Sequence, residues 1–189
     1  MALTLAKTHT FKNIRIAYPC LYRKSKYKGK ETKYTASLLF DPATNKVAME
    51  TLKTLIQEMI NTENKGNELS ADRLCFYDGN TKAHLAFKNH WILRASSNKP
   101  IKELRPDKSK IEHESESLIY SGCYVNAMVN LWWQGDEGYG KRVNCNFIAV
   151  QFCGHGEPID GSYMPDEVIA DGFNTVDVPD NNADESLPF

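Results

Sequence analysis

Alternation of apolar and polar side chains is the strongest pattern in the sequence, and it occupies residues 118–133 and 141–152. In the first run one face carries Val125, Ala127, Val129, Leu131 and Trp133, and the other carries Tyr124, Asn126, Met128, Asn130 and Trp132. Successive side chains of a strand point to opposite faces, so each run predicts a strand with one apolar and one polar face. Three glycines in the connection 134–140 favour a hairpin with a flexible loop.

Weaker patterns predict the remaining elements. Residues 11–18, 34–40 and 91–95 are expected to be strands. Residues 45–60 are expected to form a helix, because apolar residues recur there at spacings of three and four. The charged stretch 98–117 is expected to be a long loop or arm.

Composition fits one globular domain. Hydrophobic residues make up 41% of the 189 positions, and no apolar run approaches the roughly 18 residues of a membrane span. The first ten residues lack the apolar core of a secretory signal, so we expect a soluble intracellular protein. The five cysteines are scattered without CxxC spacing, which predicts no disulfide framework, no metal site and no cofactor.

The net charge of −1 conceals an asymmetry along the chain. Residues 1–156 hold all 23 basic residues and 15 of the acidic ones, a net charge of +8. Residues 157–189 hold nine acidic residues and no basic ones, a net charge of −9. A basic body joined to an acidic end suggests a nucleic-acid surface with an interaction arm.

The segment 22–34 combines six cations, one anion and three tyrosines. Cations neutralise phosphates and aromatic rings stack on unpaired bases, which is the chemistry that single-stranded nucleic acid requires. The candidate phosphate ligands here are Arg23, Lys24, Lys26, Lys28, Lys30 and Lys33, and the candidate stacking rings are Tyr22, Tyr27 and Tyr34. A lysine-rich hairpin edge that prevents aggregation would show the same pattern.

The hairpin 118–152 carries a second group of candidates. Tyr124, Trp132 and Tyr139 are candidate stacking rings, and Lys141 and Arg142 are candidate phosphate ligands. Alternation places Trp132 on the polar face and Trp133 in the core. Trp91 and Arg94 are weaker candidates for the same roles.

The acidic end is expected to be disordered from about residue 175. A flexible polyanion can compete with DNA for the cationic surface of its own chain, and a terminal aromatic residue can enter a partner's pocket. The candidate tail residues are Asp180, Asp184, Glu185, Leu187, Pro188 and Phe189. An ordinary solubilising end is the alternative.

For catalysis the nearest constellation is His113, Glu114 and Glu116, which could hold a metal for phosphodiester chemistry. The sequence contains no P-loop, GxSxG or HExxH motif. We expect a charged loop there and a protein that is not an enzyme.

Two blocks and the tail carry a family resemblance. The blocks are YPCLYRKSKYKGKETKYTASLLFDP (18–42) and YSGCYVNAMVNLWWQGDEGYGKRVNCNFIAVQFCGHGEPIDG (120–161). With an acidic tail ending in phenylalanine, the chain resembles the bacteriophage single-stranded DNA-binding proteins. That resemblance implies a mainly β, OB-fold five-stranded barrel with an inserted helix and extended loops. It also implies dimeric or cooperative behaviour, and tail contacts with replication proteins such as the phage polymerase and helicase.

Together these observations predict a DNA-binding domain over 1–173 and a flexible acidic tail over 174–189. The hypothesis is a sequence-tolerant binder that protects single strands during phage DNA replication and recombination, in the cytoplasm of the infected bacterium. Rivals are a strand-annealing protein, a metal-dependent nuclease and a scaffold protein whose basic face binds an acidic partner.

Overall fold

The computed structural model describes residues 8–135, 138–159 and 170. The six candidate tail residues and the expected boundary at 173/174 lie outside the described residues. Within the described part of the chain, the model contains no helix long and apolar enough to span a membrane.

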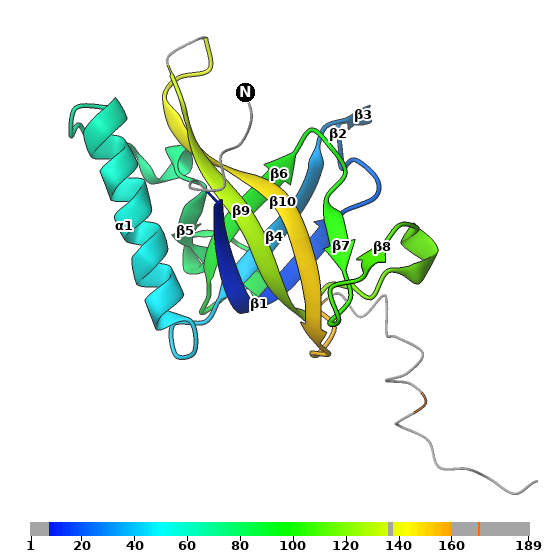
Figure 1. The fold of residues 1–189 in the computed structure, drawn as a ribbon. Coiled ribbons are helices and arrows are strands. Elements are labelled where there is room, and N and C mark those ends of the chain that lie inside the picture. The colour runs from blue at the N-terminus through cyan, green and yellow to red at the C-terminus, as the bar shows by residue number, and fades with distance from the viewer. Residues whose placement is uncertain (1–7, 136–137, 160–169, 171–189) are drawn as a thin grey trace, which may run out of the picture.

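Five strands close into a barrel (Figure 1). They are β1 (Thr8–Cys20), β4 (Tyr34–Phe40), β6 (Trp91–Ser97), β9 (Tyr124–Gln134) and β10 (Arg142–Gly154). The order β6-β4-β1-β9-β10 is antiparallel throughout, and a parallel pairing of Asn146 with Ser96 closes β10 onto β6. With only these five strands counted, the chain follows the Greek-key order of an OB-fold. The expected fold class is confirmed.

Helix α1 (Lys46–Glu63) is inserted between β4 and β6 and lies along one side of the barrel (Figure 1). Its buried residues are Met49, Leu52, Ile56 and Ile60, the stripe that the spacing predicts. The helix extends three residues beyond its expected end, and the Asn64 amide N–H caps it by donating to the Ile60 carbonyl.

Short elements decorate the barrel. Strand β5 (Phe76–Asp78) pairs with the edge of β6, and β2 (Lys26–Tyr27) with β3 (Lys30–Glu31) forms a separate small hairpin. Four 3-10 turns complete the elements: η2 (Ala71–Arg73), η3 (Gly79–Thr81), η4 (Leu85–Phe87) and η5 (Glu114–Glu116).

The expectation of a structureless arm over 98–117 is wrong. Strand β7 (Lys102–Leu104) pairs in parallel with β10, and β8 (Lys110–Ile111) pairs with β7. Ile101 and Ile111 are buried there. Single apolar residues among charges give no local periodicity, so this pairing depends on contacts distant in sequence.

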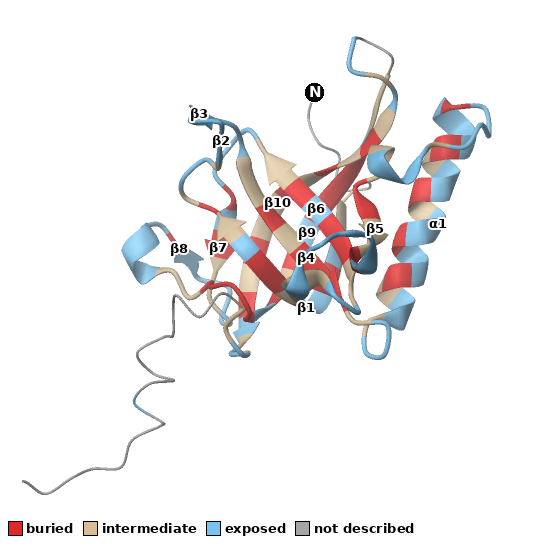
Figure 2. Ribbon diagram, turned by 180° about the vertical axis from the view of Figure 1, so that it is seen from behind, coloured by how far each residue is buried: buried red, intermediate tan, exposed pale blue. Residues whose placement is uncertain are grey.

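The barrel interior is the core (Figure 2). In β9 the predicted alternation is observed, since Val125, Ala127 and Val129 are fully buried whereas Trp132 is 40% exposed. Trp133 packs against the core, as its register predicts. The strand starts at Tyr124 rather than 118, because the preceding residues turn at Gly122, which has a φ of +118°.

Candidate nucleic-acid interface

The connection between β1 and β4 presents a basic arm. Ser25 and Thr32 close its base: the Thr32 N–H donates to the Ser25 oxygen at 2.8 Å, and the Ser25 N–H donates to the Lys33 oxygen at 2.9 Å. Beyond them β2 and β3 pair, and Lys28 and Gly29 form the turn with φ values of 49° and 77°. The arm is therefore an ordered hairpin, which gives its lysines defined positions.

The connection between β9 and β10 is tied to the segment that follows α1. Arg73 Nη1 donates to the Tyr139 oxygen at 2.8 Å, and Lys141 Nζ donates to Asn64 Oδ1 at 3.0 Å. This loop and the β2–β3 hairpin rise at the same end of the barrel (Figure 1). In OB-folds these two loops and the face of the second and third barrel strands bind oligonucleotides.

A groove of about 640 Å³ lies among the hairpin, the 71–75 segment and strands β4, β6 and β10. Five cations line it, namely Lys26, Lys33, Arg73, Arg94 and Arg142. The aromatic residues that line it are Tyr18 and Tyr27, and the acidic residue is Asp72. Most of the remaining side chains are small or polar, such as Thr35, Ser37, Ser96 and Asn144, and Leu74 and Val143 are apolar.

One donor in this groove lacks a partner. Arg142 Nε is buried and makes no hydrogen bond within the described part of the chain. Leaving a buried donor unsatisfied is costly, so such an atom calls for an explanation. The hydrogen bonding of Arg142 inside the groove is therefore incomplete.

Asp72 and Cys75 in this groove each keep one protonation state near neutral pH, Asp72 as the carboxylate and Cys75 as the neutral thiol. Hydrogen bonding by Ser70 lowers the pKa of the Asp72 carboxyl, which favours its charged form. Burial raises the pKa of the Cys75 thiol to about 12. Neither group changes charge near neutral pH, so the electrostatics of the groove are set by its five cations and one carboxylate.

The structure brings five of the sequence-predicted residues into the groove: Lys26, Tyr27, Lys33, Arg94 and Arg142. Lys28 and Lys30 lie on the exposed tip of the hairpin, and Lys28 Nζ is 5.4 Å from the centroid of the Tyr27 ring. Tyr139 is 80% exposed on the β9–β10 loop. Trp132 lies on β9, directly opposite the groove residue Asn144 of β10.

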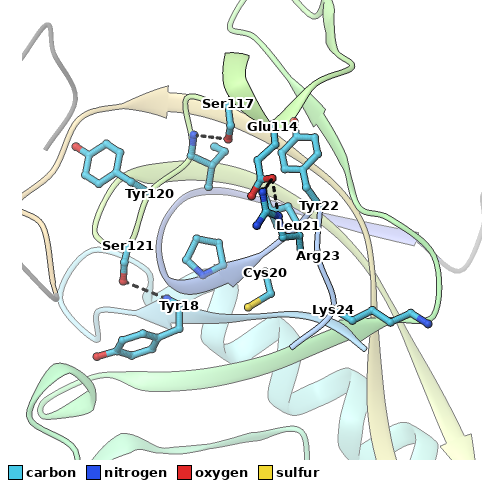
Figure 3. Close-up of a pocket in the computed structure, with 12 residues that line it drawn as sticks. Tyr18, Cys20, Leu21, Tyr22, Arg23, Lys24, Glu114, Ser117, Tyr120 and Ser121 are labelled. Atoms are coloured by element: carbon cyan, nitrogen blue, oxygen red, sulfur yellow. Dashed lines mark hydrogen bonds and ion pairs between the residues drawn. The ribbon is translucent and has the colours of Figure 1, made fainter. Parts of the chain in front are cut away.

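Three predicted residues line a different hollow, on the other side of the β1–β4 connection: Tyr22, Arg23 and Lys24. Arg23 forms an ion pair with Glu114 at 2.8 Å (Figure 3). The Tyr22 hydroxyl donates to Glu103 Oε2 at 2.8 Å. Burial and this carboxylate raise the pKa of the Tyr22 phenol well above its usual value.

The structure places the last three candidates away from the groove. Tyr34 packs against the core. The Trp91 ring centroid lies 5.2 Å from that of Phe76, with the two rings tilted at 39°, and Lys53 Nζ lies 3.8 Å from the Trp91 centroid. Tyr124 begins β9, whereas the groove residues of β10, Arg142 to Cys145, pair with the other end of that strand.

The carboxylates of the candidate nuclease group, His113, Glu114 and Glu116, are engaged in separate ion pairs. Glu114 pairs with Arg23, and Glu116 pairs with Arg105 at 2.6 Å. Among the described residues, no three His, Cys, Asp or Glu side chains are grouped so that they could hold a metal ion.

Sequence reasoning missed Tyr18, Asp72 and Arg73. Tyr18 is the last residue of the predicted strand 11–18, and Asp72 and Arg73 lie outside every predicted element. The contact of Arg73 with Tyr139 spans 66 positions, and no local pattern signals it.

Comparisons with known proteins agree with this geometry. The family model described as "Enterobacter phage Enc34, ssDNA-binding protein" matches residues 7–183. Protein p50 of the Acyrthosiphon pisum secondary endosymbiont phage 1 is 28% identical over 159 residues, covering 79% of this chain and 84% of p50.

Solved structures of the Enc34 protein share the fold. The single-stranded DNA-binding protein from bacteriophage Enc34 in complex with ssDNA has a TM-score of 0.73 at 24% identity. The match covers 82% of this chain and 90% of that one. A second structure of the same phage protein has a TM-score of 0.73 at 21% identity, covering 88% and 91%. Because the family model spans nearly the whole sequence, the chain belongs to the phage ssDNA-binding protein family typified by Enterobacter phage Enc34.

Proposed function

We propose that this protein binds single-stranded DNA, without strong sequence preference, in the groove among the β2–β3 hairpin, the 71–75 segment and strands β4, β6 and β10. The observation that carries the proposal is the convergence of five cations and two tyrosines, from two loops and three strands, on one groove. Membership of the family and the ssDNA complex of the Enc34 relative support it.

The groove residues have complementary roles. Lys26, Lys33, Arg94 and Arg142 meet phosphates, because each is a cation on the groove and charged donors form strong hydrogen bonds with phosphate oxygens. Tyr27 offers a ring for a base, and stacking tolerates any base because each has a π-face. Small side chains on β4 and β6 leave room for bases above the sheet.

Residues beside the groove extend this surface. Lys28 and Lys30 add charge at the hairpin tip, and Trp132 and Tyr139 add exposed rings on the hairpin β9–β10. Lys24 lies on the hollow at the far side of the connection, and Arg23 is held by Glu114. We assign Tyr22, Tyr34, Trp91 and Tyr124 no base contact, because each lies outside the groove.

Fluorescence anisotropy with a labelled single-stranded oligonucleotide and a duplex of equal length tests the proposal. We expect the wild type to prefer the single strand, and the double variant Arg94→Ala, Arg142→Ala to lose most of that binding. Lys110→Ala, an exposed cation on β8, serves as the matched control and should bind as the wild type does. Equal affinity for both nucleic acids would refute the proposal.

We further propose that the protein acts in the cytoplasm of the infected bacterium, coats single strands during phage replication and recombination, and binds replication proteins through residues 174–189. The net charge of −9 beyond residue 156 supports competition between tail and DNA. In the full chain, Asp180→Asn, Asp184→Asn and Glu185→Gln together should tighten DNA binding at low salt. Phe189→Ala should leave DNA binding unchanged and weaken capture of the phage polymerase or helicase.

A further inference from the structure

Tyr18 has an unusual backbone in the first strand of the barrel. In the pairing of β1 with β4, Ala17 lies opposite Ser37 and Cys20 lies opposite Thr35, so β1 contains one extra residue. Tyr18 sits in this bulge with a φ of 51°, and its N–H donates to Ser121 Oγ at 3.1 Å. Bulges near binding sites commonly redirect a side chain.

A left-handed backbone is unfavourable for a bulky side chain, and glycine or asparagine would adopt it more readily. Strain of this kind persists where the surroundings hold it, and it concentrates at functional sites. A tyrosine kept in that conformation therefore points to a functional role for its ring.

The bulge directs the ring to the junction of several hollows. Tyr18 lines the cationic groove and also another hollow, of about 500 Å³, formed with the 84–90 segment and called the 84–90 hollow below. Figure 3 shows its ring pointing away from Tyr22 and Arg23, with the Ser121 hydroxyl bound to its backbone. The side chain is 36% exposed.

Neighbouring rings fix the orientation of Tyr18. Its centroid lies 5.2 Å from that of His84 and 6.1 Å from that of Phe87, both at edge-to-face angles of about 70°. His84 and Phe87 in turn stack at 4.6 Å. A ring held against this stacked pair loses little freedom when a base stacks on it.

The side chains that line the 84–90 hollow could bind a further segment of the DNA strand. Arg15 and Lys88 line it together with His84 and His90, and among its described lining residues there is no carboxylate side chain. Leu85, at its rim, is 91% exposed. An apolar side chain standing in solvent beside cations can contact the face or edge of an unpaired base.

We propose that Tyr18 stacks a base where the DNA strand leaves the groove, and that the strand continues over the 79–90 loop. Lys88, which lines the hollow, and Lys82, exposed on the same loop, would meet its phosphates. This inference rests on the proposed function and adds a second segment to its binding site. The length of DNA bound by one protein molecule would then exceed what the cationic groove alone can hold.

The test uses full-length protein and oligo-dT of increasing length, from about 6 to about 24 nucleotides, spanning the site sizes of OB-folds. Tyr18→Asn removes the ring but tolerates the left-handed backbone, and Tyr18→Phe keeps the ring. We expect Tyr18→Asn to weaken binding by about fivefold or more, in keeping with the loss of one stacked base. Tyr18→Phe should bind as the wild type does.

The double variant Lys82→Ala, Lys88→Ala should bind the shortest oligonucleotides normally and lose affinity only for longer ones. Thermal unfolding of each variant checks that the fold is intact, and the lysine variant remains decisive if Tyr18→Asn unfolds. Wild-type binding with unchanged affinity in both Tyr18→Asn and the lysine variant would overturn the inference and leave the proposed function standing. Failure of the wild type to bind any oligonucleotide would overturn both.

Discussion

Arg73 and Tyr139 are joined by a hydrogen bond from Nη1 to the backbone oxygen, at 2.8 Å, across 66 positions of sequence. Gly140 makes this approach possible, because a Cβ at that residue would lie 3.0 Å from Arg73 Nη1. The bond joins the β9–β10 loop to the 71–73 turn, and that turn lines the groove, so the loop helps to hold one wall of the groove in place.

The substitution Arg73→Lys therefore distinguishes two roles of this residue, its hydrogen bond to the Tyr139 oxygen and its positive charge in the groove. Lysine keeps the cation in the groove but lacks the planar fork that reaches the Tyr139 oxygen. We expect about fivefold weaker ssDNA binding, equivalent to one lost hydrogen bond of about 1 kcal/mol, and faster proteolysis within residues 135–141. Unchanged proteolysis of that loop would show that the clamp does not order it.

Arg94 and Arg142 are expected to determine the salt dependence of binding. Each cation that neutralises a phosphate of single-stranded DNA contributes about 0.7 to the slope of log K against log salt. Arg94→Ala and Arg142→Ala should each lower the slope by about that amount, and Lys110→Ala should leave it unchanged. Titrations at about four salt concentrations measure the slope, and equal slopes in all variants would contradict the phosphate roles.

Asp72 is the carboxylate among the described residues of the groove, where it opposes the approach of phosphates. Asp72→Asn should tighten oligo-dT binding about twofold to fivefold at low salt, with the gain vanishing at high salt as charges are screened. Because hydrogen bonding from Ser70 lowers the pKa of Asp72, the carboxyl stays charged from pH 5 to 8 and acidification in that range should not reproduce the effect. Anisotropy titrations of the wild type and Asp72→Asn at two salt concentrations and two pH values test both expectations.

The barrel could be predicted from sequence because its strands alternate locally. Residues such as Val125 and Trp132 are assigned to a face by period alone, and the structure agrees. The basic segment 22–34 is likewise recognisable from its composition, and two of its lysines, Lys26 and Lys33, line the groove.

The rest of the site depends on contacts that no window of sequence contains. Arg73 becomes a groove residue only through its bond to Tyr139, and Glu103 becomes buried only when β7 pairs with β10. Tyr18 precedes a proline, which disfavours helical backbone at that position but does not specify a bulge. Composition alone also does not separate groove residues from their sequence neighbours. Tyr22 and Arg23 bind carboxylates of the 103–116 segment and do not line the groove.

Glu103 should be among the most sensitive positions of the fold. It is 1% exposed and accepts hydrogen bonds from the Tyr22 hydroxyl, the Ser117 hydroxyl and the Leu118 N–H, at 2.7–2.8 Å. Glu103→Ala leaves these donors without an acceptor, so the free energy of unfolding should fall by about 2–4 kcal/mol. Urea unfolding measures it, and the exposed Glu112→Ala serves as the control that should change stability little.

Tyr22 links this carboxylate to the alkaline stability of the protein. Burial and the nearby Glu103 raise the pKa of the folded-state phenol above its unfolded value, so the folded state retains a proton that the unfolded state releases first. Stability from this group is complete below pH 10, near the unfolded pKa, and is lost as pH rises above it. Tyr22→Phe should lower stability by about 1 kcal/mol at pH 7 and flatten its decline between about pH 9.5 and 11. An equal decline in both proteins, measured by urea unfolding across that range, would show that Tyr22 does not control it.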